Sequence, residues 1–178
     1  INLDKFSKKN SYLFEKNLDF LFEFFNSDKG NKYINQYMHP SKKNKIKIQA
    51  HGYSQFYENI FFKIKDKKLN IIELGSFYGN ASAALYFYFK NSRIYGADIN
   101  PDMFRFISSR VKCFFVDSSS LLSIENEIIK KKITFDIIIE DASHMLKDQI
   151  ISLFYLFPKL NQGGYFIIEE LDFPETRE

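Results

Sequence analysis

The chain has 178 residues, of which 45% are hydrophobic and 26% are charged, and its formal net charge is +3. These values are typical of a single globular domain, so they exclude a disordered or collagen-like chain, and the length leaves no room for two catalytic domains. Because the positive charge is spread through Lys-rich turns rather than gathered on one face, no nucleic-acid partner is expected.

Cysteine content and hydropathy indicate the cellular compartment. Cys113 is the single cysteine, which excludes an internal disulfide, and residues 1–30 show no secretory leader pattern. The longest apolar run, residues 81–89, is shorter than the roughly 20 residues that a membrane-spanning helix needs. We therefore expect a cytoplasmic protein without a membrane span.

Residues 1–65 are expected to form a helical or lid segment. Between residues 11 and 25 the apolar residues recur at spacings of three and four, which predicts a helix with one apolar face. The next residues stop that helix, and the Lys-rich, Pro-containing stretch that ends at residue 48 predicts a loop. A second helix is predicted over 54–64. The aromatic face of the first helix suits a homodimer contact or packing on the core equally well.

From residue 66 to residue 178 short apolar runs alternate with helical stretches. Continuous apolar strands separated by helices predict a parallel sheet with both faces covered, so we expect a doubly wound, Rossmann-like α/β core. The predicted strands are 70–74, 94–97, 113–116, 135–139 and 165–168. The predicted helices are 81–89, 101–109, 121–131 and 148–157, with Pro101 in a first helical turn and Ser118 to Ser120 supplying an N-cap.

The first predicted strand runs into Glu73-Leu-Gly-Ser-Phe-Tyr-Gly79, a tight turn bracketed by Gly75 and Gly79. Glycine permits backbone conformations and a close ligand approach that a Cβ would block. A dinucleotide fold would carry Gly-x-Gly-x-x-Gly, because pyrophosphate needs backbone N–H groups at the helix start. Here Phe77 takes the second glycine position, and the acidic Glu73 repels phosphate. The turn, which includes Ser76, therefore favours a cationic methionine group.

Acidic residues also follow the second and third predicted strands. A carboxylate at Asp98 can accept hydrogen bonds from both hydroxyls of a ribose, and Asp117 with Ser118 is placed to read the amine and ring edge of a base. Ligands of parallel sheets bind beyond the carboxyl ends of the strands. The combination predicts a cofactor that contains a nucleoside.

These strand-end residues resemble the first motif of class I S-adenosylmethionine (SAM) dependent methyltransferases, Glu/Asp-x-Gly-x-x-x-Gly. The resemblance implies SAM as cofactor, with Glu73 and Gly75 bordering its methionyl and sulfonium part. It also implies that Asp98 holds the ribose diol, that Ile99 packs on adenine and that Asp117 lies at the adenine position.

The last two predicted strands end in a group of acids. Asp141, Glu169 and Glu170 follow neighbouring strands, and three carboxylates at one place repel one another unless a cation lies between them. Hard oxygen ligands suit Mg²⁺ or a similar divalent cation, which would lower the pKa of an acceptor hydroxyl. His144 is the candidate general base, since imidazole titrates near neutral pH. Strand alternation predicts that Glu140 points away from this site.

The run Asp141-Ala-Ser-His144, together with Ile168-Glu-Glu-Leu171, resembles the metal-dependent sugar O-methyltransferases that modify macrolide glycosides. That family carries Asp-Gly-Ser-His and Ile-Glu-Asp-Leu at these places. The resemblance implies metal ligation by Asp141, Glu169 and Glu170 and a catalytic pair formed by His144 and Asp141. Glu170 in place of Asp lengthens one proposed ligand by a methylene group.

Two upstream elements extend this resemblance. Ser27-Asp-Lys-Gly30 and His51-Gly-Tyr-Ser-Gln-Phe-Tyr57 resemble the family's (Thr/Ser)-Asp-Lys and His-Gly-Tyr-x-x-x-Tyr elements. We expect five residues of these elements to close over the amino-acid end of the cofactor or over the substrate: Asp28, Lys29, His51, Tyr53 and Tyr57. The aromatic spacing also suits a helix that packs on the sheet. The usual methyltransferase sheet has seven strands, so further strands are expected after residue 178.

Together these observations predict an O-methyltransferase that uses SAM and Mg²⁺ to methylate a hydroxyl of a sugar or nucleotide-linked small molecule. The composition is that of an AT-rich genome, which favours a capsular or other surface-polysaccharide precursor, phosphoramidate-type groups included. Residues 140–143 lack the Asn/Asp-Pro-Pro-Tyr/Phe clamp of enzymes that methylate base amines. A non-catalytic SAM-binding or scaffold protein and an NAD-dependent oxidoreductase stay open as alternatives.

Overall fold

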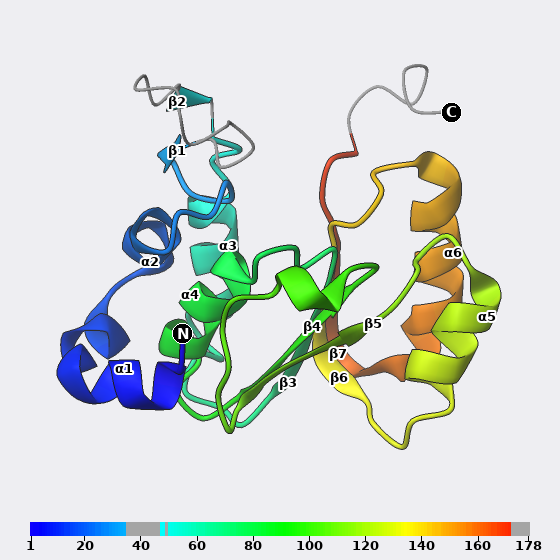
Figure 1. The fold of residues 1–178 in the computed structure, drawn as a ribbon. Helices are drawn as coiled ribbons and strands as arrows, with labels where there is room; N and C mark the ends of the chain where they lie inside the picture. The colour runs from blue at the N-terminus through cyan, green and yellow to red at the C-terminus, as the bar shows by residue number, and fades with distance from the viewer. Residues whose placement is uncertain (35–46, 49, 172–178) are drawn as a thin grey trace.

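The computed structural model describes residues 1–34, 47–48 and 50–171 (Figure 1). Its main sheet has the strand order β5-β4-β3-β6-β7, and every neighbouring pair is parallel. The strands are β3 (Asn70–Leu74), β4 (Arg93–Asp98), β5 (Val111–Phe115), β6 (Phe135–Glu140) and β7 (Leu160–Ile168). All five predicted strands are therefore present, and the predicted α/β class is confirmed.

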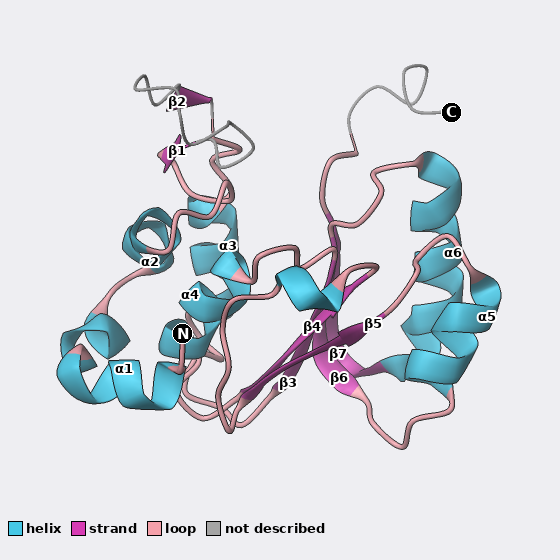
Figure 2. Ribbon diagram, in the orientation of Figure 1, coloured by secondary structure: helices cyan, strands magenta, loops and turns pink. Residues whose placement is uncertain are grey.

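Helices cover both faces of this sheet (Figure 2). One face carries α1 (Leu3–Lys9), α2 (Leu18–Phe24), α3 (Ser54–Phe61) and α4 (Asn80–Tyr88), and the other carries α5 (Leu121–Ile124) and α6 (Leu146–Leu156). Successive strand residues alternate between two apolar clusters, as Ile71 and Ile72 do. The strands read as continuous apolar runs because both faces are buried. Among the described helices, none is long and apolar enough to cross a membrane.

The N-terminal helices complete the core on one side. Every residue of α4 from Ala81 to Tyr88 is buried, because the sheet covers one side of the helix and α2 packs on the other (Figure 1). Phe22 of α2 and Phe61 of α3 belong to the same apolar cluster as Ile71 of the sheet. The predicted lid segment thus shares its core with the sheet.

The helix predicted over 11–25 is interrupted. A 3₁₀ segment, Ser11–Glu15, is followed by α2, and Asn17 caps α2 by accepting a hydrogen bond from the Phe20 N–H at 3.0 Å. The apolar spacing continues across the break because Leu13 and Leu18 face the same cluster. Helix α1, which was not predicted, begins after a similar cap at Asn2.

The helix predicted over 101–109 is wrong. Pro101 does occupy a first turn, but that 3₁₀ turn ends at Met103 and the chain then becomes extended. Ile107 forms a parallel bridge with Asn2, and the Leu3 N–H donates to the Ile107 carbonyl at 2.9 Å. Pairing with the N-terminal residues and burial of Phe106 outweigh the helical spacing in this segment.

In the region predicted as a loop, β1 (Tyr33–Ile34) pairs antiparallel with β2 (Lys47–Ile48). Residues 35–46 of that predicted loop lie outside the described residues. The remaining helices begin close to where they were predicted, and α5 continues as a wider π-helical turn, Glu125–Ile129, with Ser120 as its predicted N-cap.

The strand order reverses between β3 and β6, which are neighbours although the chain forms β4 and β5 between them. Parallel sheets bind ligands at such a switch point. The register aligns the ends of the strands there, with Leu74 opposite Glu140 and Glu140 opposite Ile168. The residues that follow β3, β6 and β7 therefore meet at one edge of the sheet.

Candidate active site

The turn after β3 depends on two glycines in the left-handed region. Gly75 has φ +78° and Gly79 has φ +77°. A Cβ built on Gly75 would stand 2.0 Å from the carbonyl oxygen of Asp141, and one built on Gly79 would stand 2.5 Å from the ring of Phe104. Both glycines are thus required by close packing of the protein on itself, and Gly75 lets the loop after β6 pass directly over the turn.

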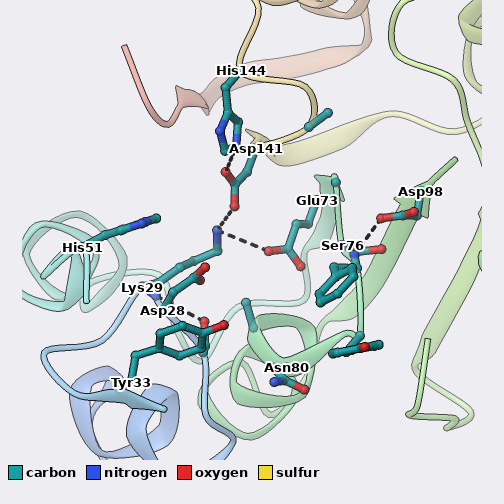
Figure 3. Close-up of a pocket in the computed structure, with 16 residues that line it drawn as sticks. Asp28, Lys29, Tyr33, His51, Glu73, Ser76, Asn80, Asp98, Asp141 and His144 are labelled. Carbon is teal, nitrogen blue, oxygen red and sulfur yellow. Dashed lines mark hydrogen bonds and ion pairs between the residues drawn. The ribbon is translucent and has the colours of Figure 1, made fainter. Parts of the chain in front are cut away.

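Two cavities meet at this turn and share Gly75, Asp98 and Ala142 as walls. The first has a volume of ≈ 210 Å³ and the second ≈ 300 Å³. Of the predicted site residues, the first is lined by Asp28, Lys29, Glu73, Gly75, Ser76, Asp98, Asp141 and His144 (Figure 3). The second is lined by Gly75, Asp98, Ile99, Asp117 and Ser118. A ligand with one charged end and one flat, less polar end would match this pair.

Asp98 lies between the two cavities with its carboxylate held in place. Its Oδ2 accepts a hydrogen bond from the Phe77 N–H at 2.7 Å (Figure 3), and its Oδ1 accepts one from the Asn100 N–H at 2.8 Å. Each carboxylate oxygen can accept a second hydrogen bond. The side chain is only 9% exposed, so its orientation suits a pair of hydroxyl groups that bridge the cavities.

The second cavity has apolar walls from Leu74, Ala97 and Val116 and polar residues at Asp117 and Ser118. The polar edge is ordered locally, because the Asp117 carboxylate accepts hydrogen bonds from both the N–H and the hydroxyl of Ser119. A planar base with a hydrogen-bonding edge fits such a surface.

Three carboxylates surround Lys29 beside the first cavity. Its Nζ lies 2.5 Å from Asp141 Oδ2, 2.7 Å from Glu169 Oε2 and 3.5 Å from Glu73 Oε1 (Figure 3 shows Asp141 and Glu73). The Lys29 side chain is 2% exposed. The cation that the clustered carboxylates require is therefore an ammonium group from the N-terminal segment. Lys29 was predicted to contact the cofactor, and its ion pairs were not predicted, since no local spacing in the sequence links these residues.

Burial and the shared ammonium set the protonation of these acids. Burial raises the pKa of Glu73 to about 7, and this exceeds the opposite effect of Lys29. Burial also acts to raise the pKa of both Asp141 and Glu169. For Asp141 the Lys29 ammonium and the His144 hydrogen bond outweigh burial, so its pKa is lowered, whereas the pKa of Glu169 is raised. Of these two carboxyl groups, Asp141 is therefore the one that stays ionised.

Two tyrosines hold the consecutive carboxylates of Glu169 and Glu170. Tyr57 lies in α3 and Tyr53 precedes that helix by one residue, so the two rings are one helical turn apart. The Tyr57 hydroxyl donates to Glu169 Oε1, and the Tyr53 hydroxyl donates to Glu170 Oε1 at 2.9 Å. Burial and these carboxylates raise the pKa of both tyrosines. His51 Nδ1 also lies 3.2 Å from Glu170 Oε1.

The three predicted divalent-cation ligands do not all converge on one point in this arrangement. Asp141 and Glu169 each direct one oxygen at Lys29, and Glu170 contacts Tyr53 and His51. Within residues 1–34, 47–48 and 50–171, no group of three His, Cys, Asp or Glu side chains is arranged to hold a metal ion. As the side chains stand, they fit an ammonium group, and ligation of Mg²⁺ by this set stays a prediction.

His144 and Asp141 form a hydrogen-bonded pair on the wall of the first cavity. His144 Nε2 lies 2.9 Å from Asp141 Oδ1 (Figure 3), and the Asp141 N–H donates to the Leu74 carbonyl at 3.1 Å. His144 has φ +60°, so the loop turns sharply there. An ionised carboxylate that orients an imidazole beside a ligand cavity is an arrangement suited to proton abstraction.

Not every predicted site residue lines a cavity. Gly79, Tyr53, Glu169 and Glu170 are absent from both linings. Three residues that were not predicted as site residues also line one or the other: Tyr33, Asn80 and Asp148. No motif marks these three, because their place depends on how loops close over the sheet. Ser143, which belongs to the Asp141-Ala-Ser-His144 run, lines the second cavity.

Glu140 lines neither cavity, as strand alternation predicted. It is fully buried, and burial raises its pKa to about 7. Neither of its carboxyl oxygens has a hydrogen-bond partner in the described part of the chain. A protonated, neutral carboxyl group suits that environment.

Comparisons with known proteins point to one enzyme class. The chain is 30% identical over 128 residues to an 8-demethyl-8-α-L-rhamnosyl tetracenomycin-C 2′-O-methyltransferase of Streptomyces olivaceus, covering 68% of this chain and 33% of that protein. It is 26% identical to the demethylmacrocin O-methyltransferase of Streptomyces fradiae, covering 68% of this chain and 32% of that protein. No protein-family model matches.

Among solved structures, the MycE methyltransferase of the mycinamycin pathway, in complex with Mg, S-adenosylhomocysteine and mycinamycin VI, superimposes with a TM-score of 0.68 and 20% identity. The match covers 86% of this chain and 39% of that one. The chain thus spans about a third of the length of the curated relatives it matches. In sequence the chain is similar to O-methyltransferases of tetracenomycin and macrolide pathways, and in fold it is similar to the MycE methyltransferase.

Proposed function

We propose that this chain carries the cofactor-binding and catalytic part of a SAM-dependent O-methyltransferase that acts on a hydroxyl of a sugar-containing small molecule. The observation that carries the proposal is the pair of adjacent cavities that share Asp98, with His144 and Asp141 on the wall of the charged one. In this assignment the adenosine lies in the second cavity, Asp98 accepts from the ribose diol, and the methionyl group extends toward Lys29, Asp28 and Glu73.

The transfer requires one bond to form and one to break. The acceptor oxygen attacks the methyl carbon as the bond between that carbon and the sulfonium sulfur breaks, which leaves S-adenosylhomocysteine. His144 takes the proton of the hydroxyl, and the ionised Asp141 stabilises the imidazolium that results. During this transfer the sulfonium of the donor loses its positive charge and His144 gains one. In this assignment both groups lie beside the charged residues of the first cavity.

The nature of the acceptor rests on the relatives. The Streptomyces olivaceus relative is named for 2′-O-methylation of a rhamnosyl tetracenomycin, which supports a sugar hydroxyl. The similarity gives no support to the surface-polysaccharide or phosphoramidate acceptor expected from composition. A divalent cation, when bound, would supply hydroxyl activation, and Mg is present in the MycE complex. Metal dependence, a cytoplasmic location and a homodimer stay predictions for this chain.

Calorimetry tests the cofactor, and methyl incorporation tests the activity. SAM is expected to bind to the chain, whereas NAD⁺ is not, since Glu73 and Phe77 disfavour pyrophosphate. Radiolabelled SAM would then be incubated with nucleotide sugars and with rhamnosylated polyketides, with and without Mg²⁺. Incorporation that is lost in His144→Ala supports the enzyme. SAM binding without incorporation into any acceptor would favour the non-catalytic alternative, and NAD⁺ binding in place of SAM would contradict the proposal.

A further inference from the structure

Every carboxylate oxygen of Asp141 and Glu169 already has a partner. Asp141 Oδ1 contacts His144 Nε2, and Glu169 Oε1 accepts from the Tyr57 hydroxyl. The two other oxygens, Asp141 Oδ2 and Glu169 Oε2, both contact Lys29 Nζ at 2.5 and 2.7 Å. The ammonium nitrogen therefore lies at the point on which these two oxygens converge.

A divalent cation that uses these two carboxylates would need that same point. Metal–oxygen distances are about 2.0–2.6 Å for Mg²⁺ and Ca²⁺, so an ion bound to both oxygens would lie close to the present position of Nζ. An ammonium and a divalent cation that close together repel strongly in a buried site, where screening by water is weak. Lys29, Glu169 and Glu73 are each at most 4% exposed.

We propose that Lys29 is an internal counter-ion that competes with a divalent cation for Asp141 and Glu169, so that the cation binds only when Lys29 withdraws. The proposal rests on the proposed function, because the divalent cation is expected from that assignment. Lys29 also lines the charged cavity together with Asp28. The withdrawn ammonium therefore moves into this cavity, where the carboxylate of Asp28 is a new partner for it.

The contacts around Lys29 indicate that its side chain, rather than its backbone, makes this move. The Tyr53 N–H donates to the Lys29 carbonyl at 2.9 Å, and the His51 N–H donates to the Asp28 carbonyl at 2.8 Å. These bonds tie the Lys29 backbone to the segment that precedes α3, whose Tyr57 also holds Glu169. When a divalent cation replaces Nζ, Tyr57 still holds Glu169 and His144 still contacts Asp141.

Cation affinity measured without SAM and without turnover tests this competition. Mn²⁺ would be titrated by electron paramagnetic resonance into the whole chain, into Lys29→Met, which keeps the aliphatic stem, and into Lys32→Met as a matched control. Lys32 lies three residues away, is 73% exposed and pairs with Glu23. We expect Lys29→Met to bind Mn²⁺ at least about tenfold more tightly than the unmodified chain, a difference equivalent to about 1.4 kcal/mol, and Lys32→Met to show no change.

A second measurement uses the unmodified chain, in case Lys29→Met fails to fold. Amine acetylation read by mass spectrometry should find Lys29 protected without cation and reactive in saturating Mg²⁺, while Lys32 reacts in both conditions. Affinity that is unchanged or weaker in a folded Lys29→Met variant would overturn the proposal. So would protection of Lys29 that persists in saturating Mg²⁺, or a lack of Mn²⁺ binding by every variant. SAM binding is measured on the same samples. If they bind SAM, only the competition between Lys29 and the cation has failed, whereas samples that do not bind SAM contradict the proposed function.

Discussion

Gly75 lies so close to Asp141 that a Cβ on the glycine would stand 2.0 Å from the carbonyl oxygen of the aspartate. This contact joins the turn after β3 to the loop after β6 across the switch point of the sheet. It brings the proposed donor-binding turn and the His144–Asp141 pair into one site. The position of the proposed base relative to the proposed cofactor site therefore depends on a residue without a side chain.

Gly75→Ala is expected to destabilise the fold for two reasons: Ala would have to adopt a left-handed backbone conformation, and its Cβ would clash with Asp141. Left-handed backbone costs a non-glycine residue about 1–2 kcal/mol, and the clash with Asp141 adds about 1–3 kcal/mol. Gly163→Ala is the matched control, since Gly163 has φ +78° but a Cβ there would meet nothing within 4 Å. Urea unfolding measures both variants. Equal losses in the free energy of unfolding would contradict the importance of the Gly75–Asp141 contact.

Asp98→Asn is expected to weaken SAM binding by roughly 10- to 100-fold, the range that follows from losing a hydrogen bond to a charged group. The amide nitrogen of Asn lacks the acceptor that Asp98 Oδ2 offers to the Phe77 N–H and to a ribose hydroxyl. Isothermal titration calorimetry gives the affinity, with the exposed Asp102→Asn as a control that should bind normally. Unchanged SAM affinity in Asp98→Asn would remove Asp98 from the proposed cofactor site.

His144→Gln is expected to lower the rate of methyl transfer by roughly 10²- to 10⁴-fold, as loss of a general base does. Its SAM affinity should stay near that of the unmodified chain, because the assigned role of His144 concerns the acceptor proton. Met145→Ala, an exposed neighbour, is the control for disturbance of the loop. The test is single-turnover transfer at saturating SAM. Full turnover by His144→Gln would show that another group takes the proton.

Asp4 should make the stability of the fold depend on pH in the acid range. Burial acts to raise its pKa, but hydrogen bonds from Ser108, Ser109 and Tyr86 outweigh burial and lower the pKa below its ordinary value of 3.8. Because the pKa of Asp4 is lower in the folded chain than in the unfolded chain, its ionised form stabilises the fold at pH values above the pKa in the unfolded chain. This contribution is lost as the pH falls through the pKa in the folded chain.

Asp4→Asn is therefore expected to cost about 1–2 kcal/mol at neutral pH, for a partly exposed carboxylate that accepts several hydrogen bonds. The difference from the unmodified chain should shrink below about pH 4. Thermal or urea unfolding between pH 3 and pH 7 measures it, with Asp102→Asn as the exposed control. A difference that stays constant down to pH 3 would show that the Asp4 charge plays no part.

The sequence by itself determined the strands, the parallel class of the sheet and the residues at the strand ends. Both faces of a doubly wound sheet are buried, so each strand reads as an apolar run, and the polar residues that follow it stand out locally. Asp98, Asp141 and His144 were found in this way, and the cavities include all three.

The tertiary structure alone decided which charges meet. Lys29 is separated by 112 residues from Asp141 and by 140 from Glu169, and the helix expected over 101–109 gave way to pairing with Asn2. An apolar pattern shows which surface of a segment is buried, but an ion pair or a bridge depends on how distant segments pack together. The sequence therefore indicated that the acidic cluster needs a cation, and the packing of the N-terminal segment on the sheet placed Lys29 there.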